Sequence, residues 1–460
     1  MKLFGKKSKE VVYTRYSGTG SGLSAWRETI EKLMQPEGKP ETLDDILVID
    51  VSQGNFAGII AASLFAEFGA EVIKIEPPQG DPARWMTPFG KTAAGVGIPF
   101  IVEGRNKRYM TLDLPNSARD RQIFGQLAQK AAVVIETCPA GQMDGWGIGY
   151  RQISVSNPGL VYITITPYGQ YSHQAEACAG MPDTDITTQA GSGLSAQMGD
   201  MATAPEPFNW PLKAGMWMGW YLSGLSAALG GTVALYHRQR TGEGQMVDVA
   251  GMDAYAAITG MPVAVGYTWE NARPRIGVLD FILYPYGHWK CKDGYVAIAA
   301  PRDHDFRALV KILGLWGWTG KFENDWRYTS DRIPDLLEQA MRLHRQIEAK
   351  TMRYTADELV SRALNYARKA ARSKWRGGGV PIIMKVMTPE KALAHKQWKE
   401  RNSFKEIEDP ALGKVIVTAG FVKMSESPPR IKWISCDIGK DDEYVRSKYG
   451  LPRAHTAEAP

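Results

Sequence analysis

The chain has 460 residues, of which 44% are hydrophobic and 23% are charged, and its formal net charge is +6. This composition is ordinary for a globular protein and excludes collagen-like, fibrous and disordered chains. The length predicts two domains rather than one. Because the mild positive charge contains no dominant Lys/Arg block, we expect no nucleic-acid partner, whereas a phosphorylated, acidic ligand is compatible with it.

The cysteines and the apolar runs indicate a cytoplasmic protein. Four cysteines are spread along the chain without a C-x-x-C pair: Cys138, Cys178, Cys291 and Cys436. This spacing predicts neither a metal site nor a disulfide framework and favours a reducing compartment. Since no uninterrupted apolar run reaches about 18 residues and the basic N-terminus lacks an apolar core, we expect no membrane span and no signal peptide.

The first part of the chain has an α/β pattern. Residues 1–42 are an appended N-terminal extension with a short helix expected from Gly22 to Met34. Ile46–Val51 is a β-prone run, Ile59–Phe68 is helical, and Glu71–Glu76 is a second strand, which together make a Rossmann-like βαβ unit. G-x-G-x-x-G is absent, so a dinucleotide site has little support.

The alternation of strands and helices continues beyond this unit. Strands are predicted at Arg108–Leu114, Val133–Glu136 and Leu160–Thr166, with a helix at Ala118–Ala131 between the first two. A glycine-rich core helix follows from Met216 to Tyr236, and Gln245–Ala250 is a further strand. These elements predict an open, mainly parallel sheet with helices on both faces.

From about residue 253 the pattern changes to α+β. His288–Ile298 reads as a hairpin turning at Asp293-Gly294, and helices are expected at Asp305–Leu313, Ile333–Lys350 and Ala356–Ala371. A flexible loop, Arg376–Gly379, precedes a short apolar run. We therefore expect a large Rossmann-like domain at 43–250, a small α+β domain with linkers at 251–400, and a C-terminal segment at 401–460 that returns to the large domain.

Several motifs resemble the class III coenzyme A transferases, in the order that the family has them. They are Phe68–Glu76 with Gly80-Asp81 and Arg84, Arg105–Leu114, Asp185–Gly193, and the frame Trp220–Gly224 followed by Arg240–Gln245. In the family the last frame reads D-x-x-S-G, then R-x-T-G-x-G-Q. Here a tryptophan, Trp220, stands where the family has its aspartate.

The resemblance implies a fold and a reaction. The fold is a dimer of chains interlocked like linked rings, each with a large and a small domain. In the family the aspartate attacks an acyl-CoA thioester, is converted to an aspartyl-CoA thioester, and passes CoA to a second acid. Because an indole cannot do this, we expect no catalytic residue on this chain, CoA or acyl-CoA only as a substrate, and a heterodimer with a catalytic paralogous subunit.

Among heteromeric members the chain is similar to the Asp-lacking subunit of an enzyme of anaerobic toluene degradation. That enzyme moves CoA from succinyl-CoA to (R)-benzylsuccinate. Two alternatives stay open: a self-sufficient homodimeric transferase that uses Asp185, and a non-enzymatic CoA-binding or assembly protein. The other interpretation of Asp185 is structural, as the cap of a helix that starts at Ile186 or Thr187.

Matching positions of the family supply candidate binding residues. Those expected at CoA are Lys74, Arg84, Asn106, Lys107, Arg108, Leu112, Glu136 and Thr137. Cations of this set would hold phosphates, or they form ion pairs within the domain. The segment Glu136–Gly141 departs from the family's E-N-F-x-P-G, and Gly145 replaces an arginine. Asn55, Trp217 and Trp220 are expected at the subunit interface or the substrate pocket.

Overall fold

The computed structural model describes residues 20–181, 183–201, 205–206, 209–269, 275–279, 284–315, 333–372, 380–434 and 437–453. Its main element is a six-stranded sheet whose strands are all parallel, in the order β5-β2-β1-β6-β7-β8. The strands are β1 (Leu47–Asp50), β2 (Glu71–Glu76), β5 (Lys107–Thr111), β6 (Val133–Glu136), β7 (Val161–Thr166) and β8 (Gln245–Ala250). The predicted parallel sheet is thus confirmed.

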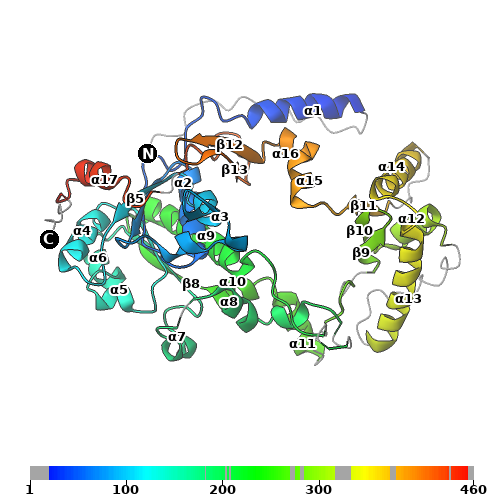
Figure 1. Cartoon of the computed structure of the whole chain (residues 1–460), viewed down its shortest axis with the longest axis horizontal. Coiled ribbons are helices and arrows are strands. Elements are labelled where there is room, and N and C mark those ends of the chain that lie inside the picture. The colour runs from blue at the N-terminus through cyan, green and yellow to red at the C-terminus, as the bar shows by residue number, and fades with distance from the viewer. Residues whose placement is uncertain are drawn as a thin grey trace.

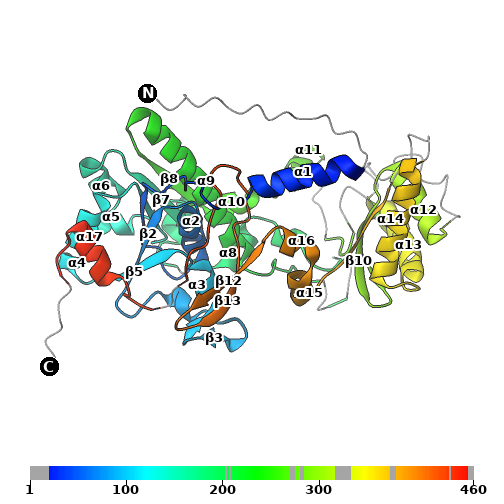
Figure 2. The same cartoon turned by 90° about the horizontal axis from the view of Figure 1, so that it is seen from above.

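Helices cover both faces of this sheet, as Figures 1 and 2 show. On one face lie α2 (Phe56–Glu67), α3 (Ile98–Glu103) and α9 (Met218–Thr241), whose apolar side chains share a core with the sheet. The opposite face is covered by α4 (Ala118–Ala128), α5 (Gln142–Gly145), α6 (Tyr150–Ser156) and α17 (Asp442–Tyr449). The central strands β1, β6 and β7 are buried along their whole length because each face packs against helices.

Close contact between α2 and α9 depends on glycine. A Cβ added to Gly224 would lie 2.6 Å from the carbonyl oxygen of Ala57 on α2, so this position of α9 has no room for a side chain. The two helices consequently approach at backbone distance. This approach sets the position of the N-terminal turn of α9, where the family's aspartate is expected.

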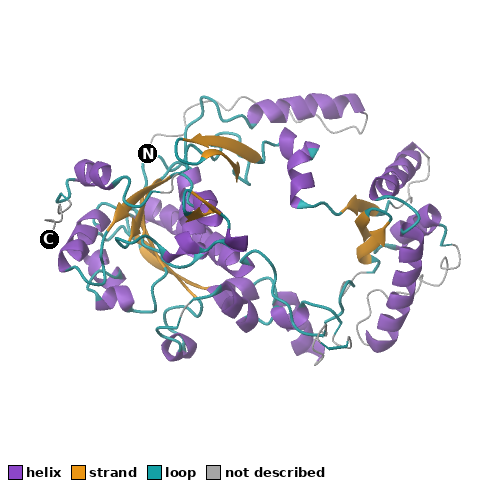
Figure 3. Ribbon diagram, viewed as in Figure 1, coloured by secondary structure: helices purple, strands orange, loops and turns teal. Residues whose placement is uncertain are grey.

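A second, smaller unit contains a three-stranded antiparallel sheet of β9 (Tyr286–Cys291), β10 (Gly294–Ala299) and β11 (Ile382–Lys385), in the order β11-β10-β9. It packs against α12 (Asp303–Leu313), α13 (Ile333–Thr351) and α14 (Ala356–Arg372) around a core of its own. The predicted hairpin is present, but its turn is Lys292-Asp293, one residue earlier than predicted, because Gly294 already pairs with Cys291 in the sheet. Figure 3 shows this unit set apart from the large sheet.

Two separate connections join the units (Figure 1). One passes through α10 (Gly251–Ala256) and α11 (Gly260–Trp269), and the other through α15 (Pro389–Ala394) and α16 (Lys396–Glu400). The chain then forms the hairpin of β12 (Phe404–Asp409) and β13 (Gly413–Thr418). Ile407, Val417, Ile431 and Ile434 are buried in the same core as β1, so the C-terminal segment packs on the large sheet.

The remaining helices and strands include one helix of 14 residues, α1, and several short elements. They are α1 (Gly20–Leu33), β3 (Thr92–Ala93), β4 (Val96–Gly97), α7 (His173–Ala177) and α8 (Asp185–Gly191). Most predicted boundaries are right to within a few residues, but the core helix continues to Thr241 rather than ending near Tyr236. The N-terminal 19 residues, the loop Arg376–Gly379 and Cys436 lie outside the described residues. Within those residues, no helix has the length and apolarity to cross a membrane.

Candidate active site

A cavity lies at the point where the strand order of the sheet changes direction, between β1 and β6. After β1 the chain adds β2 and β5 on one side of β1, and it then adds β6, β7 and β8 on the other side. In open α/β sheets the loops at the carboxyl ends of two such strands separate and leave a crevice for ligands. Here the cavity measures about 560 Å³, and its lining includes Gln53–Asn55, Thr137–Ala140, Thr166–Gly169, Ala175, Cys178–Met181, Asp183, Thr184 and Thr187.

The lining is neutral apart from one acid. Among the described residues around the cavity there is no Lys, Arg or His, and Asp183 is the carboxylate. Pro139, Pro167 and Met181 contribute apolar surface. The cavity therefore suits the uncharged part of a ligand and offers no cation to a phosphate or a free carboxylate.

Trp220 lies in the first turn of α9 and is buried, with 5% of its surface exposed. Its ring centroid is 6.0 Å from that of Phe56 and 5.8 Å from that of Trp217, and Phe56 stacks on Trp217 at 4.6 Å. The expected position of the family's aspartate is thus occupied by an indole within an aromatic cluster. Its Nε1 atom is buried and has no hydrogen-bond acceptor among the described residues.

Asp185 lies directly beside Trp220. Its Oδ1 accepts hydrogen bonds from the backbone N–H groups of Gly219 at 2.7 Å and Trp220 at 3.3 Å. Its Oδ2 accepts from Gln189 Nε2 at 2.8 Å and from Lys213 Nζ at 3.3 Å. All four donors come from within the chain, so this carboxylate satisfies the open N–H groups at the start of α9.

The expectation that Asp185 caps its own helix is wrong in detail. Asp185 is the first residue of α8, whose N-cap is Thr184, and the carboxylate instead caps α9. The cause lies in the turn before α9, where Met216 and Trp217 have positive φ angles of 62° and 53°. This uncommon turn brings the first N–H groups of α9 onto Asp185.

Asp183 and Asn55 form a second polar pair, at the cavity. Asn55 caps α2 through its Oδ1, which accepts from the backbone N–H of Ala57 at 3.0 Å, and its Nδ2 donates to Asp183 Oδ2 at 3.1 Å. The other oxygen, Asp183 Oδ1, is buried and has no donor among the residues that the structure describes. The pKa of Asp183 is raised to about 6, chiefly by burial; the side chain of Trp220, as a hydrogen-bond donor, opposes the rise, and the neighbouring Asp185 adds to it.

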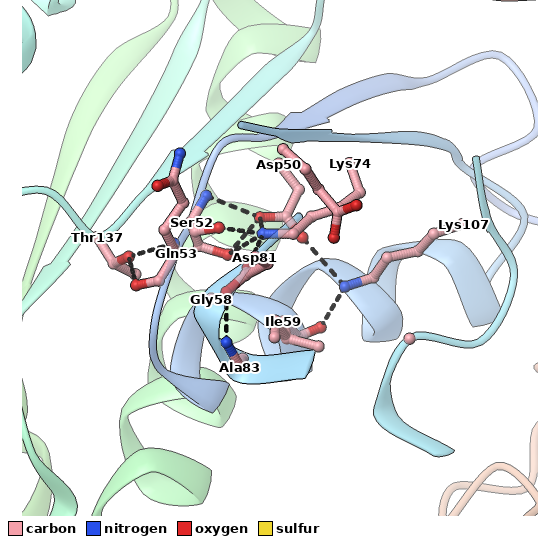
Figure 4. A network of polar contacts seen from close by, with 12 residues as sticks. Asp50, Ser52, Gln53, Gly58, Ile59, Lys74, Asp81, Ala83, Lys107 and Thr137 are labelled. Atoms are coloured by element: carbon pink, nitrogen blue, oxygen red, sulfur yellow. Dashed lines mark hydrogen bonds and ion pairs between the residues drawn. The ribbon is translucent and has the colours of Figure 1, made fainter. Parts of the chain in front are cut away.

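The lysines expected at CoA, on strands β2 and β5, are buried in a network with carboxylates (Figure 4). Lys74 Nζ lies 2.8 Å from Asp81 and 3.6 Å from Asp50, and Lys107 Nζ lies 3.1 Å from Asp50. Burial acts to raise the pKa of Asp50, but Lys74 and Lys107 hold it below its ordinary value. For Lys107, burial dominates and lowers its pKa to about 8.

The other candidates for CoA binding are also engaged within the chain. Arg84 pairs with Glu76 through two hydrogen bonds, of 2.9 and 2.7 Å, and Arg108 pairs with Asp441 at 2.9 Å. Asn106 accepts from the backbone N–H of Lys432 at 2.7 Å. These contacts explain the positions of the polar side chains without a ligand.

The remaining three candidates differ in their surroundings. Leu112 is a core residue, and Glu136 is buried with its pKa raised to about 8 by burial. Thr137 lines the cavity and accepts a hydrogen bond from the backbone N–H of Gln53 at 3.0 Å. Thr137 is thus the one of the eight CoA candidates that lines the cavity. Asn55 is the one of the three interface or pocket candidates that does so.

Sequence reasoning gives Asp183 a weaker claim as a nucleophile than Asp185, although the structure places Asp183 at the cavity. The available signal was its position two residues before Asp185, within a stretch that resembles the family. The described residues contain no cluster of three or more His, Cys, Asp or Glu arranged to hold a metal ion.

Comparison with known proteins identifies the family. The model of CoA-transferase family III matches residues 43–442. The alpha subunit of succinyl-CoA–L-malate CoA-transferase from Chloroflexus aurantiacus is 30% identical over 448 residues, which cover 92% of this chain and 93% of that protein. Subunit BbsE of succinyl-CoA:(R)-benzylsuccinate CoA-transferase from Thauera aromatica is 32% identical over 252 residues, covering 53% of this chain and 56% of that subunit.

Solved structures share the fold. A CaiB/BaiF family protein from Brucella suis superposes with a TM-score of 0.71 at 24% identity, and the match covers 89% of this chain and 100% of that one. This likeness extends over both units of the molecule. The match of the family model over most of the sequence shows that the chain belongs to CoA-transferase family III.

Proposed function

We propose that this chain is the Asp-lacking subunit of a heteromeric class III CoA-transferase. The observation that carries the proposal is Trp220, a buried indole at the position where the family has its nucleophilic carboxylate. An indole has no group that can take up an acyl residue as an anhydride. A related partner chain would supply the aspartate, and this chain would contribute interlocking surface and part of the substrate pocket.

Two further features support a partner. The carboxylate that accepts from the backbone N–H of Trp220, that of Asp185, is engaged by four donors of its own chain, two of them at the start of α9. The candidate cations for the phosphates of CoA are held by carboxylates of their own chain. A complete CoA site would therefore lie on the catalytic partner.

For the substrates we propose succinyl-CoA as the donor and an aromatic dicarboxylic acid such as (R)-benzylsuccinate as the acceptor, as in anaerobic toluene degradation. The name of the BbsE relative and the aromatic cluster of Phe56, Trp217 and Trp220 support this choice. The alpha subunit named for L-malate makes a smaller dicarboxylic acid the first competitor to test.

The proposed assembly is a pair of interlocked chains in the cytoplasm. The two separate connections between the units support interlocking, because a second chain must pass between such connections. Cys138, Cys178 and Cys291 are free thiols, which supports a reducing compartment. Acyl-CoA and a small carboxylic acid would be the ligands of this assembly.

One specific observation favours the self-sufficient alternative that uses Asp185. Its carboxylate lies within hydrogen-bond distance of the backbone N–H of Trp220, so a carboxylate is present beside the family's position. Against it stands the geometry, because attack on a thioester would need Asp185 to give up donors from α9. We therefore rank this alternative second.

The deciding experiment measures CoA transfer from succinyl-CoA to (R)-benzylsuccinate and to L-malate. The chain is assayed alone and after coexpression with a related chain that carries D-x-x-S-G, each as native protein and as Asp185→Asn. The proposal is supported if only the coexpressed pair transfers CoA and if the pair keeps this activity with the Asp185→Asn variant. Transfer by the lone chain that disappears in a folded Asp185→Asn variant would favour the alternative. Binding of CoA without transfer by either preparation would indicate a non-enzymatic CoA-binding or assembly protein.

A further inference from the structure

Two carboxylates lie near Trp220, and they differ in how they are held. Asp185 accepts four hydrogen bonds, from two backbone N–H groups, an amide and a lysine. Asp183 accepts one, from Asn55, and its second oxygen is buried without a donor from the described part of the chain. An oxygen left without a donor keeps its lone pairs available for a reacting group.

The surroundings of Asp183 favour reactivity. It lines a cavity of about 560 Å³ whose described lining contains no Lys, Arg or His, so no cation neutralises it there. Burial raises its pKa to about 6, so near pH 7 the carboxylate is mostly ionised yet more basic than an exposed one. A desolvated, ionised carboxylate in a cleft is a candidate nucleophile.

Trp220, which stands at the position of the family's aspartate, lies close to the carboxylate of Asp183. Its indole side chain faces Asp183 as a hydrogen-bond donor that lowers the pKa of that carboxyl, although the contact lacks the geometry of a formed hydrogen bond for either atom. The replacement of the family's carboxylate by tryptophan thus leaves a carboxylate beside residue 220. That carboxylate comes from the segment before α8 rather than from α9.

We infer that Asp183 is an acyl-accepting carboxylate of this chain, so that the crevice beside Trp220 forms a covalent intermediate of its own. The inference rests on the proposed function, because it needs acyl-CoA to reach the crevice. The partner's aspartate would still carry the main turnover. Asp183 would add a second, slower site.

The covalent steps balance without a further reactant. An oxygen of Asp183 attacks the thioester carbonyl carbon, a C–O bond forms, the C–S bond breaks, and CoA leaves as the thiolate. The product is a mixed anhydride. The thiolate then attacks the side-chain carbonyl carbon of Asp183, which forms the aspartyl-CoA thioester and releases the donor acid as its carboxylate. Attack by the acceptor carboxylate, followed by return of the thiolate to the new acyl group, regenerates Asp183.

Trapping of the intermediate tests the inference. The chain is paired with a partner whose family aspartate is changed to alanine, incubated with succinyl-CoA, and quenched with hydroxylamine, which converts an activated aspartyl group to a hydroxamate. Peptide mass spectrometry should find the hydroxamate at Asp183. The label should be lost in Asp183→Asn and should decline as the pH falls through about 6. The exposed Glu243 is the control carboxylate and should stay unlabelled.

The outcomes separate this inference from the proposed function. If the intact pair transfers CoA but the pair with the inactivated partner gives no hydroxamate at Asp183, the inference is overturned and the proposed function stands. If the intact pair transfers no CoA, the proposed function fails. The lone chain, treated in the same way, then decides the inference by the presence or absence of label at Asp183.

Discussion

The backbone N–H of Trp220 donates to the carboxylate of Asp185 at 3.3 Å. These residues belong to different helices, 35 positions apart, and both stand in stretches that resemble family motifs. Their contact couples the start of α9 to the start of α8. It also gives Asp185 a structural role that can be tested apart from catalysis.

Replacement of Asp185 by alanine should destabilise the protein. The change leaves the N–H groups of Gly219 and Trp220 without their acceptor in a buried place, and such a loss costs about 1–3 kcal/mol in the free energy of unfolding. Urea unfolding followed by tryptophan fluorescence measures it. The matched control is Glu243→Ala, an exposed carboxylate whose loss should change stability by less than about 0.5 kcal/mol. Equal effects would contradict the capping role.

Gly224 and Gly125 offer a matched pair of glycine-to-alanine changes. An added methyl group at Gly224 meets the backbone of α2, so Gly224→Ala should cost about 1–3 kcal/mol through forced separation of α2 and α9. At Gly125, inside α4, nothing lies within 4 Å of the added Cβ. Gly125→Ala should therefore stabilise by about 0.5–1 kcal/mol, because alanine favours helix. Thermal unfolding of the two variants should shift in opposite directions.

Within the buried network, Lys74→Met should be more damaging than Lys107→Met. Lys74 pairs with both Asp50 and Asp81, and removal of one partner of a buried ion pair costs about 3–5 kcal/mol. Lys107 has its pKa lowered to about 8, so its charge is already disfavoured by burial, and Asp50 retains Lys74 when Lys107 is lost. Urea unfolding at pH 7 ranks the two variants. A larger loss for Lys107→Met would show that this view of the network is wrong.

Glu136 should make stability depend on pH. Burial raises its pKa from 4.5 to about 8, so between these values the folded state holds a proton that the unfolded state has released. Stability should then fall as pH rises through this window, by at most about 1.4 kcal/mol per pH unit from this group. Glu136→Gln removes the effect, so its stability relative to the native protein should increase from pH 5 to pH 8. A constant difference across these pH values would indicate an ordinary pKa.

The sequence was most informative about features that a single short segment determines, such as a strand, a turn or a family motif. The apolar run at Ile46–Val51 and the alternation of strand and helix predicted the parallel sheet, because burial on both faces leaves a continuous apolar pattern. The turn residues Asp293-Gly294 predicted the hairpin. The family motifs predicted the family, which the match over residues 43–442 confirms.

Roles that depend on distant residues could not be predicted. Asp185 finds its donors on α9 only because Met216 and Trp217 turn the chain, and no pattern near Asp185 signals this. In the same way, the sequence around Lys74 does not tell whether this lysine binds a phosphate or pairs with Asp81. The oxygen of Asp183 without a donor is a property of three-dimensional burial alone.

The return of the C-terminal segment to the large sheet has a consequence for synthesis on the ribosome. Asn106, beside β5, is held by the backbone of Arg430 and Lys432, and Ile431 and Ile434 complete the core that begins at Val48. The first half of the chain leaves the exit tunnel long before these residues exist. The large unit must therefore wait, with part of its apolar surface uncovered, until translation is almost finished, and this interval is when chaperones have access to it.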